Sequence, residues 1–345
     1  MRGVYSAQFL NTLATRVAPA ELASAPLDPG TAFDLIAGTS TGAILAGALA
    51  LGVPMSEVIS LYRDRGPSIF ANPMPAKKWK LLAWCLANAS RPANPSEPLR
   101  ESLQGVFGAA TLGTVFKDRG IGLCVPATNL STHSSWVFKT PHDPTRTRDA
   151  NYSLVDVCMA TTAAPIFLPP ALVPDPDDPE GATPFVDGGL WANNPTLVAL
   201  IDALSLAKAD QDVEVFSVGT CPPPVGHVVG SPAAWGLAAW QVGAEVLATS
   251  LDAQSAGYSF MAQLIAPHLS KPCRVFTLPC SPLSASQSAE VALDKASPAA
   301  IEILTDAARH DANHAYGEFL RGAETPGSRL ARALRSAASE AVPIP

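Results

Sequence analysis

Apolar positions along the chain switch repeatedly between short continuous runs and the three-to-four-residue spacing of a helix. Helical spacing covers residues 4–13, and a short apolar run at 33–37 follows a Pro/Gly loop. A longer apolar stretch at 43–52 begins directly after a glycine-containing turn. The N-terminal region therefore predicts a helix, a buried strand and a second helix in succession.

The rest of the chain continues this alternation. Strands are predicted at 121–128 and 213–220 with a hairpin-like return at 135–139, and helices at 153–163, 233–265 and 298–321. The acidic, proline-rich stretch 174–184 is expected to be a surface loop. Strands that alternate with helices predict an α/β fold whose mostly parallel central sheet is covered on both faces.

The turn between the first strand and the second helix has the sequence Gly38-Thr-Ser-Thr-Gly42. A strand, a GxSxG turn and a helix in succession are typical of a nucleophile elbow, which lifts its serine clear of the neighbouring residues. Glycines two residues to either side let the backbones pass closely. Helix N–H groups also point toward negative charge that develops beside the serine. Ser40 is therefore the candidate nucleophile.

A serine hydroxyl needs a base within hydrogen-bond reach. Asp187 is the best candidate, because it closes an apolar run and is followed by Gly188 and Gly189, which let other backbone approach. His310 or His314 would complete a conventional triad in the chain order Ser, Asp, His, although both fall inside a polar helical stretch. The other histidines, at 133, 142, 227 and 268, lie in polar or proline-rich loops and are expected to be solvated.

Composition restricts the function classes. The 345 residues are 48% hydrophobic and 15% charged, which permits one large α/β domain or two smaller ones. The net charge of -7 disfavours a nucleic-acid polymer as partner. Six cysteines lack the spacing of a metal site or a disulfide framework, and neither a signal peptide nor a bilayer-spanning run is found. We expect a cytoplasmic protein, with contact at the inner face of the cell membrane left open.

Two tryptophans, Trp79 and Trp84, accompany lysines in a helical stretch at 77–86. Such a helix either rests on a membrane or packs on the core with its lysines reaching outward, and the packed arrangement is favoured.

Three motifs make the chain resemble the patatin-like phospholipase family over most of residues 1–220. They are the GTSTG turn, the Asp187-Gly188-Gly189 sequence within DGGLWANNP, and the run ATTAAPIFLPP at 160–170. The resemblance implies a three-layer α/β/α fold and a Ser40–Asp187 dyad without histidine. In that dyad Asp187 is the base and Ser40 forms an acyl-enzyme, with no metal or cofactor.

The same family carries a glycine-rich DGGGxRG segment after its first strand, whose N–H groups form the oxyanion hole. Arg2-Gly3 match the end of that segment, whereas the strand and the preceding glycines are not in the sequence. Thr41 N–H remains as one candidate donor. We therefore expect the natural protein to start upstream, with a hydrolase domain at 1–321 and a C-terminal tail at 322–345.

The resemblance implies hydrolysis of fatty-acyl esters in phospholipids at a membrane surface. It is strongest to bacterial stand-alone phospholipases, including antiphage effectors that a small cyclic nucleotide activates. Two alternatives stay open: an esterase or thioesterase with a Ser40–Asp187–His triad, and a catalytically impaired lipid-binding module. Head-group preference and oligomeric state are not predicted.

Overall fold

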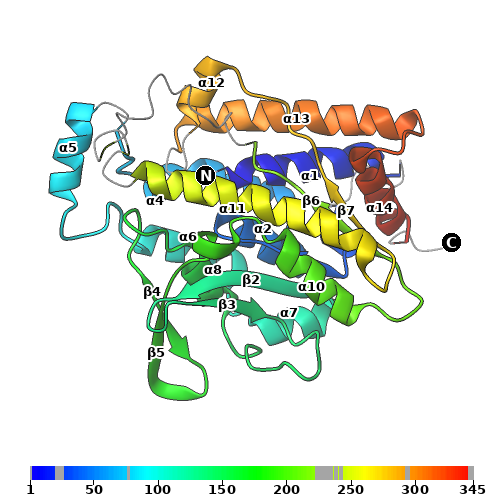
Figure 1. Cartoon of the computed structure of the whole chain (residues 1–345), viewed down its shortest axis with the longest axis horizontal. Coiled ribbons are helices and arrows are strands. Elements are labelled where there is room, and N and C mark those ends of the chain that lie inside the picture. Colours follow the sequence, from blue (N-terminus) through cyan, green and yellow to red (C-terminus); the bar gives the residue numbers. More distant parts are fainter. Residues whose placement is uncertain are drawn as a thin grey trace.

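A sheet with helices packed on both faces forms the body of the computed structural model (Figure 1). The structure describes residues 2–19, 27–75, 78–221, 236, 240, 244–291 and 296–340. The described strands are β1 (Leu35–Ala37), β2 (Gly122–Asn129), β3 (Ser134–Lys139), β4 (Ala171–Asp175), β5 (Asp178–Asp187), β6 (Val213–Ser217) and β7 (Cys273–Thr277).

The described α-helices connect and cover these strands. They are α1 (Gly3–Val17), α2 (Thr41–Leu51), α3 (Met55–Ser60), α4 (Gly66–Ile69), α5 (Lys78–Ala87), α6 (Glu97–Phe107), α7 (Leu112–Arg119), α8 (Leu154–Thr162), α9 (Gly189–Ala192), α10 (Thr196–Leu206), α11 (Ala244–Ile265), α12 (Ala285–Glu290), α13 (Pro298–Leu320) and α14 (Pro326–Glu340). The α/β class predicted from the sequence is confirmed.

The main sheet is organised around β2. One edge of β2 pairs antiparallel with β3 along residues 124–129. Its other edge pairs first with β1, in parallel over residues 122–124, and then with β5, antiparallel over residues 127–129. The last residues of β1 and β5 therefore approach one another beside Val125 and Pro126.

Alternation along β2 shows how the two faces are covered. Leu123, Val125 and Ala127 belong to the main apolar core together with residues of α2 and α8. The side chain of Cys124, which points the opposite way, donates a hydrogen bond to Asp202 of α10. Helices α2 and α8 thus pack on one face of the sheet and α10 on the other.

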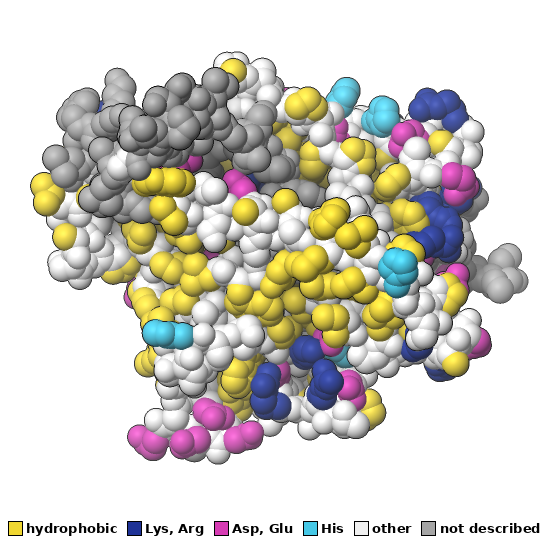
Figure 2. Space-filling model, in the orientation of Figure 1, with side chains coloured by type: hydrophobic (Ala, Val, Ile, Leu, Met, Phe, Trp, Pro, Cys, Tyr) yellow, Lys and Arg dark blue, Asp and Glu magenta, His cyan; other side chains and the backbone are white. Residues whose placement is uncertain are grey.

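The proline-rich stretch 174–184 is not the loop that its composition indicates. β4 and β5 form an antiparallel hairpin there, with an irregularity in the pairing at Pro174/Asp175. The hairpin projects from the lower left of the molecule, and acidic side chains gather at its tip (Figures 1 and 2). Pro174 is tolerated because it lies at the irregularity, in a strand that stands at one end of the pairing order.

The strand predicted at 213–220 is present as β6, but the sequence did not indicate which strand it pairs with. β6 pairs in parallel with β7, and these two strands form a sheet of their own among the described residues. The helix predicted from residue 233 is described from Ala244 onward as α11, and residues 222–235 lie outside the described part.

The C-terminal segment after Gly322 contains a packed helix. Leu330, Ala331 and Leu334 of α14 are buried in the main core, and α14 contacts α1 and α13. The stretch that the sequence separates as a tail therefore contributes to the core of the molecule.

Helix α5 occupies the position predicted for the tryptophan-containing stretch. Trp84 is buried, packs on Phe167 and donates to the Asn72 side chain, as the packed arrangement requires. The side chain of Trp79 lies outside the described residues. Within the described part of the chain, none of the helices has the length and hydropathy needed to cross a bilayer.

Candidate active site

Ser40 lies on a strained turn between β1 and α2. Its φ of 54° and ψ of -130° place a non-glycine residue in a region that L-residues rarely adopt. A Cβ on Gly38 would overlap the Gly42 carbonyl oxygen, so the turn closes this tightly only with glycine at position 38. The Ser40 side chain is thereby presented at the N-terminus of α2.

Asp187 meets Ser40 because β1 and β5 end at neighbouring positions along β2. Ala37 pairs with Cys124 and Asp187 pairs with Ala127. The Ser40 hydroxyl donates a 2.8 Å hydrogen bond to Asp187 Oδ2, although 147 positions separate the two residues in the sequence.

The environment of Asp187 favours a carboxylate that accepts protons readily. Asp187 is buried, and this burial raises its pKa from 3.8 to about 6. The N–H of Gly189 donates to Oδ1 at 2.7 Å, and this bond and the Ser40 hydroxyl partly oppose the rise. The carboxylate is thus held by two donors and remains more basic than an exposed aspartate.

Two threonines hold the elbow in place. Thr161 Oγ1 accepts from the Ser40 backbone N–H at 2.9 Å and donates to the Pro126 carbonyl at 2.6 Å. Thr39 Oγ1 donates to the Ala192 carbonyl at 2.6 Å. Sequence reasoning did not single out either threonine, although a small polar residue at the end of the apolar helix α8 was a usable signal for Thr161.

Gly188, Gly189 and Gly42 differ in what their backbone atoms contact. A Cβ on Gly188 would overlap the Pro126 carbonyl oxygen, whereas Gly189 supplies the N–H that binds Asp187. At Gly42 nothing lies within 4 Å of the position of a Cβ, so close backbone passage, expected on both sides of Ser40, is found only at Gly38.

Arg2, Gly3 and Thr41 lie together beside the elbow. A Cβ on Gly3 would lie 3.3 Å from the Thr41 carbonyl oxygen and 2.9 Å from Tyr62 Oη, which itself donates to that carbonyl. Thr41 N–H begins α2, and the hydrogen bonds described for this part of the chain give it no acceptor. It is therefore available to an oxyanion beside Ser40.

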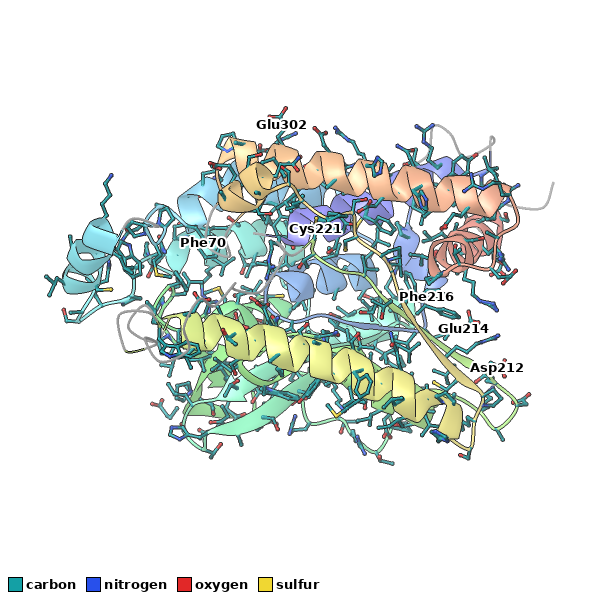
Figure 3. The ribbon with its side chains drawn as sticks, turned by 45° about the horizontal axis from the view of Figure 1, so that its top comes forward. Phe70, Asp212, Glu214, Phe216, Cys221 and Glu302 are labelled. Carbon is teal, nitrogen blue, oxygen red and sulfur yellow. The ribbon has the colours of Figure 1, made fainter. Side chains whose placement is uncertain are left out.

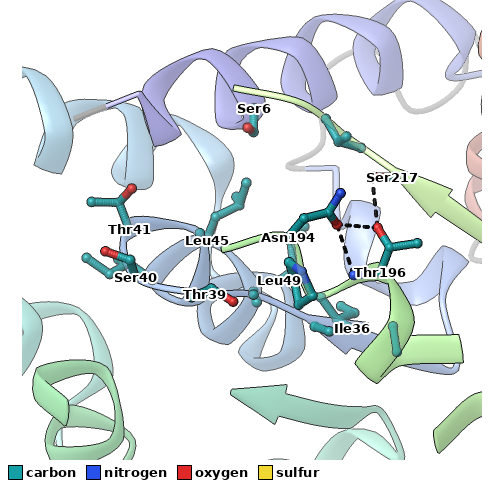
Figure 4. A pocket seen from close by; sticks show the side chains of 18 of the residues that line it. Ser6, Ile36, Thr39, Ser40, Thr41, Leu45, Leu49, Asn194, Thr196 and Ser217 are labelled. Atoms are coloured by element: carbon teal, nitrogen blue, oxygen red, sulfur yellow. Dashed lines mark hydrogen bonds between the residues drawn. The ribbon is translucent and has the colours of Figure 1, made fainter. Parts of the chain in front are cut away.

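A cavity of about 890 Å³ opens beside Ser40 and Asp187 (Figure 4). Ser40 and Thr41 lie at one end, Ile36, Leu45 and Leu49 line the middle, and Asn194, Thr196 and Ser217 form a hydrogen-bonded group farther along. Arg2 also lines the cavity, and burial lowers the pKa of its guanidinium.

The family model for patatin-like phospholipase matches residues 1–200. The chain belongs to the patatin-like phospholipase family.

Three curated relatives of this family are named as cGAMP-activated phospholipases. The Escherichia coli (strain TW11681) protein is 38% identical over 196 residues, covering 55% of this chain and 51% of the relative. The Vibrio cholerae protein is 34% identical over 197 residues, covering 55% of this chain and 53% of the relative. The Pseudomonas aeruginosa protein is 32% identical over 325 residues, covering 92% and 87%. The chain thus spans about half the length of the first two relatives.

The two histidines considered for a conventional triad lie elsewhere. His310 and His314 are exposed on α13, and neither lines the cavity beside Ser40. The nearest acid described for His314 is Glu318, at 3.9 Å on the same helix. The structure therefore brings Ser40 and Asp187 together without either histidine.

One buried cluster in this patatin-like chain has metal-ligand chemistry. Ligand atoms of Cys124, His142 and Asp202 lie within 4.8 Å of one another. However, Lys139 Nζ donates to Asp202 at 2.7 Å and Cys124 Sγ donates to its other oxygen, so the charge of this carboxylate is already balanced. The expectation that His142 is solvated was wrong, since Thr140 and Asp202 hold it in the interior.

Proposed function

We propose that this chain is a serine acyl hydrolase that cleaves fatty-acyl esters of glycerophospholipids. One observation carries the proposal: the Ser40 hydroxyl donates a 2.8 Å hydrogen bond to a buried Asp187 whose pKa is raised to about 6. Membership of the patatin-like phospholipase family supports lipid esters as the substrate class. The strained backbone at Ser40 supports its role as nucleophile.

In the proposed reaction, Ser40 Oγ attacks the ester carbonyl carbon while its proton passes to Asp187 Oδ2. The ester C–O bond breaks, the leaving alkoxide takes this proton, and the acyl group stays on Ser40. Water then attacks the acyl-enzyme and gives a proton to Asp187. The bond between Oγ and the acyl carbon breaks, Ser40 recovers the proton, and fatty acid is released.

The electrostatics of the site suit this sequence of proton transfers. At neutral pH an Asp187 with a pKa of about 6 is mostly ionised and still accepts a proton more readily than an ordinary aspartate. Thr41 N–H and the positive end of the α2 dipole would stabilise the oxyanion. The reaction uses no metal or cofactor in this scheme.

We propose further that a cyclic dinucleotide such as cGAMP activates the hydrolase. The names of the three bacterial relatives support this regulation. We propose that lipid hydrolysis switched on by such a signal serves the antiphage role that the resemblance implies.

Release of fatty acid from mixed phospholipid vesicles tests the proposal. Wild type, Ser40→Ala, Asp187→Asn and a control with both His310→Ala and His314→Ala would be compared with and without cGAMP. We expect release by wild type and the histidine control, increased by cGAMP, and a loss of at least about a hundredfold in the other two. Release of fatty acid by Ser40→Ala at the wild-type rate would overturn the proposal. No release from any form, with vesicle binding retained, would favour a lipid-binding module.

A further inference from the structure

Helix α11 is apolar on the face that it turns to solvent. Residues four or seven positions apart lie on one face of a helix, and Val246, Ala253, Phe260 and Leu264 are all exposed at that spacing. The outward face of a surface helix normally carries charged or polar side chains. The exposed stripe of α11 therefore lacks the chemistry of a face that stays in water.

The neighbouring helix α10 extends this uncharged surface. The two helices pack together, and Ile201 of α10 is exposed. Among the described residues of α10 and α11, none that is exposed is ionisable: Glu245 and Asp252 are half-buried, and Asp202 is buried and accepts from Lys139. We call this surface the α10–α11 face, and its exposed large apolar residues are Ile201, Val246, Phe260, Met261, Leu264 and Ile265. Hydrophobic side chains recur along α11 and below it over α10 (Figure 2).

The opposite face of α11 forms a wall of the cavity beside Ser40. The lining residues that it contributes are Leu247, Leu251 and Ser255. α11 lies across the front of the molecule in both orientations drawn, and Figure 3 shows Glu214 and Phe216 of β6 along one side of it (Figures 1 and 3). One helix thus separates the cavity of the candidate active site from solvent and is apolar toward both.

Contacts of α11 also connect the exposed face to the segment after Asp187. Gln254 accepts a 3.0 Å hydrogen bond from the backbone N–H of Asn193, and α11 packs against α9. Leu190 of α9 lines the cavity and is still 38% exposed. The apolar surface therefore continues from the outside of α11 to the edge of the cavity that holds Ser40.

A phospholipid bilayer is the partner that this arrangement fits. An acyl ester reaches Ser40 most readily if its chains never pass through water, because exposure of apolar area to water is unfavourable in proportion to that area. An apolar face on the helix that walls the cavity provides such a path. Anionic headgroups attract clusters of basic side chains, and the exposed residues described for α10 and α11 include none.

We propose that the α10–α11 face docks on the bilayer that contains the substrate, with Phe260 and Leu264 entering its apolar region. The choice of a bilayer as partner rests on the proposed hydrolysis of lipid esters. Because apolar burial drives this docking, uncharged phosphatidylcholine vesicles suffice, and binding depends only weakly on salt.

Sedimentation with phosphatidylcholine vesicles at low and high salt tests the docking. All proteins carry Ser40→Ala, so that no lipid is consumed. The test variant adds Phe260→Ser with Leu264→Ser, and the matched control adds Leu172→Ser with Leu320→Ser, two leucines that are each 64% exposed on other elements. We expect the Kd for vesicles to rise at least about tenfold in the test variant and to stay unchanged in the control.

A second pair of substitutions and a soluble substrate guard against misfolding. Ile201→Ser with Val246→Ser removes other side chains of the same face and should also weaken vesicle binding. With Ser40 restored and cGAMP present, both test variants should hydrolyse a water-soluble p-nitrophenyl ester at the wild-type rate. On phosphatidylcholine vesicles they should be at least about tenfold slower than wild type.

Three outcomes would overturn the docking proposal. They are equal vesicle binding by the test variants and their parent, binding that requires anionic lipid and falls steeply with salt, and a lipid-free dimer that the substitutions dissociate, since a second copy would then cover the face. Each leaves ester hydrolysis by Ser40 untouched. Vesicle binding that the test variants lose, in a wild type that hydrolyses neither substrate, would support docking and count against the proposed function.

Discussion

Asp187 lies at the end of a paired strand, is buried and is the proposed proton acceptor. Its pKa of about 6 predicts that kcat/KM on a water-soluble short-chain ester rises about tenfold per pH unit below pH 6 and levels off above it, because only the ionised carboxylate accepts the Ser40 proton. Initial rates between pH 4.5 and 8.5 check this. A midpoint near the ordinary aspartate value of 3.8 would contradict it.

The same pKa has the opposite consequence for stability. The folded state binds the Asp187 proton more tightly than the unfolded state, so ionisation disfavours folding as pH rises from about 4 through 6. A shift of roughly two units corresponds to a cost of about 3 kcal/mol at neutral pH. Asp187→Asn is expected to resist denaturant better than wild type at pH 7.5 and equally at pH 4. A wild type that is the more stable form at pH 7.5 would contradict this assignment.

Two glycines of the elbow provide a matched pair of substitutions. Gly38→Ala should cost about 2–4 kcal/mol and most of the activity, because its Cβ would overlap the Gly42 carbonyl. Gly42→Ala should be neutral or stabilise by up to about 1 kcal/mol, because its Cβ meets open space in the first turn of α2. Denaturant unfolding measures the free energy of unfolding of the two variants. Equal values would show that the backbone does not pass closely at Gly38.

At the scale of elements, the C-terminal helix offers the clearest test. Leu330→Ala in α14 is expected to cost about 2–5 kcal/mol of stability, since the side chain is completely buried against the main core. Leu320→Ala at the end of α13 is the matched control, because that leucine is largely exposed. Thermal unfolding of both variants measures the difference, and equal Tm values would mean that α14 is a dispensable tail.

Short contiguous sequence patterns predicted the strand, turn and helix that hold Ser40. The elbow could be read from the sequence because GTSTG, the strand before it and the helix after it are contiguous. The β4–β5 hairpin was missed because proline and acidic residues favour loops, and only its position at the sheet edge accommodates them. The buried surroundings of His142 depend on Asp202, sixty positions away, and no local pattern reports that contact.

At the scale of the whole molecule, long-range pairing decides what the sequence leaves open. The contact between Ser40 and Asp187 could be expected from two motifs, but its geometry depends on where β1 and β5 end along β2. The separation of β6 and β7 from the main sheet could not be predicted, because a strand pattern does not specify its neighbours.

In the proposed reaction Ser40 carries the acyl group during turnover. The most direct test is the mass of the protein quenched during hydrolysis of a p-nitrophenyl ester at pH 7.5. We expect wild type to gain one acyl group on the peptide containing Ser40, and Asp187→Asn to gain it at least about a hundredfold more slowly. Turnover by a wild type that gains no acyl group, or gains it on another residue, would rule out Ser40 as the nucleophile.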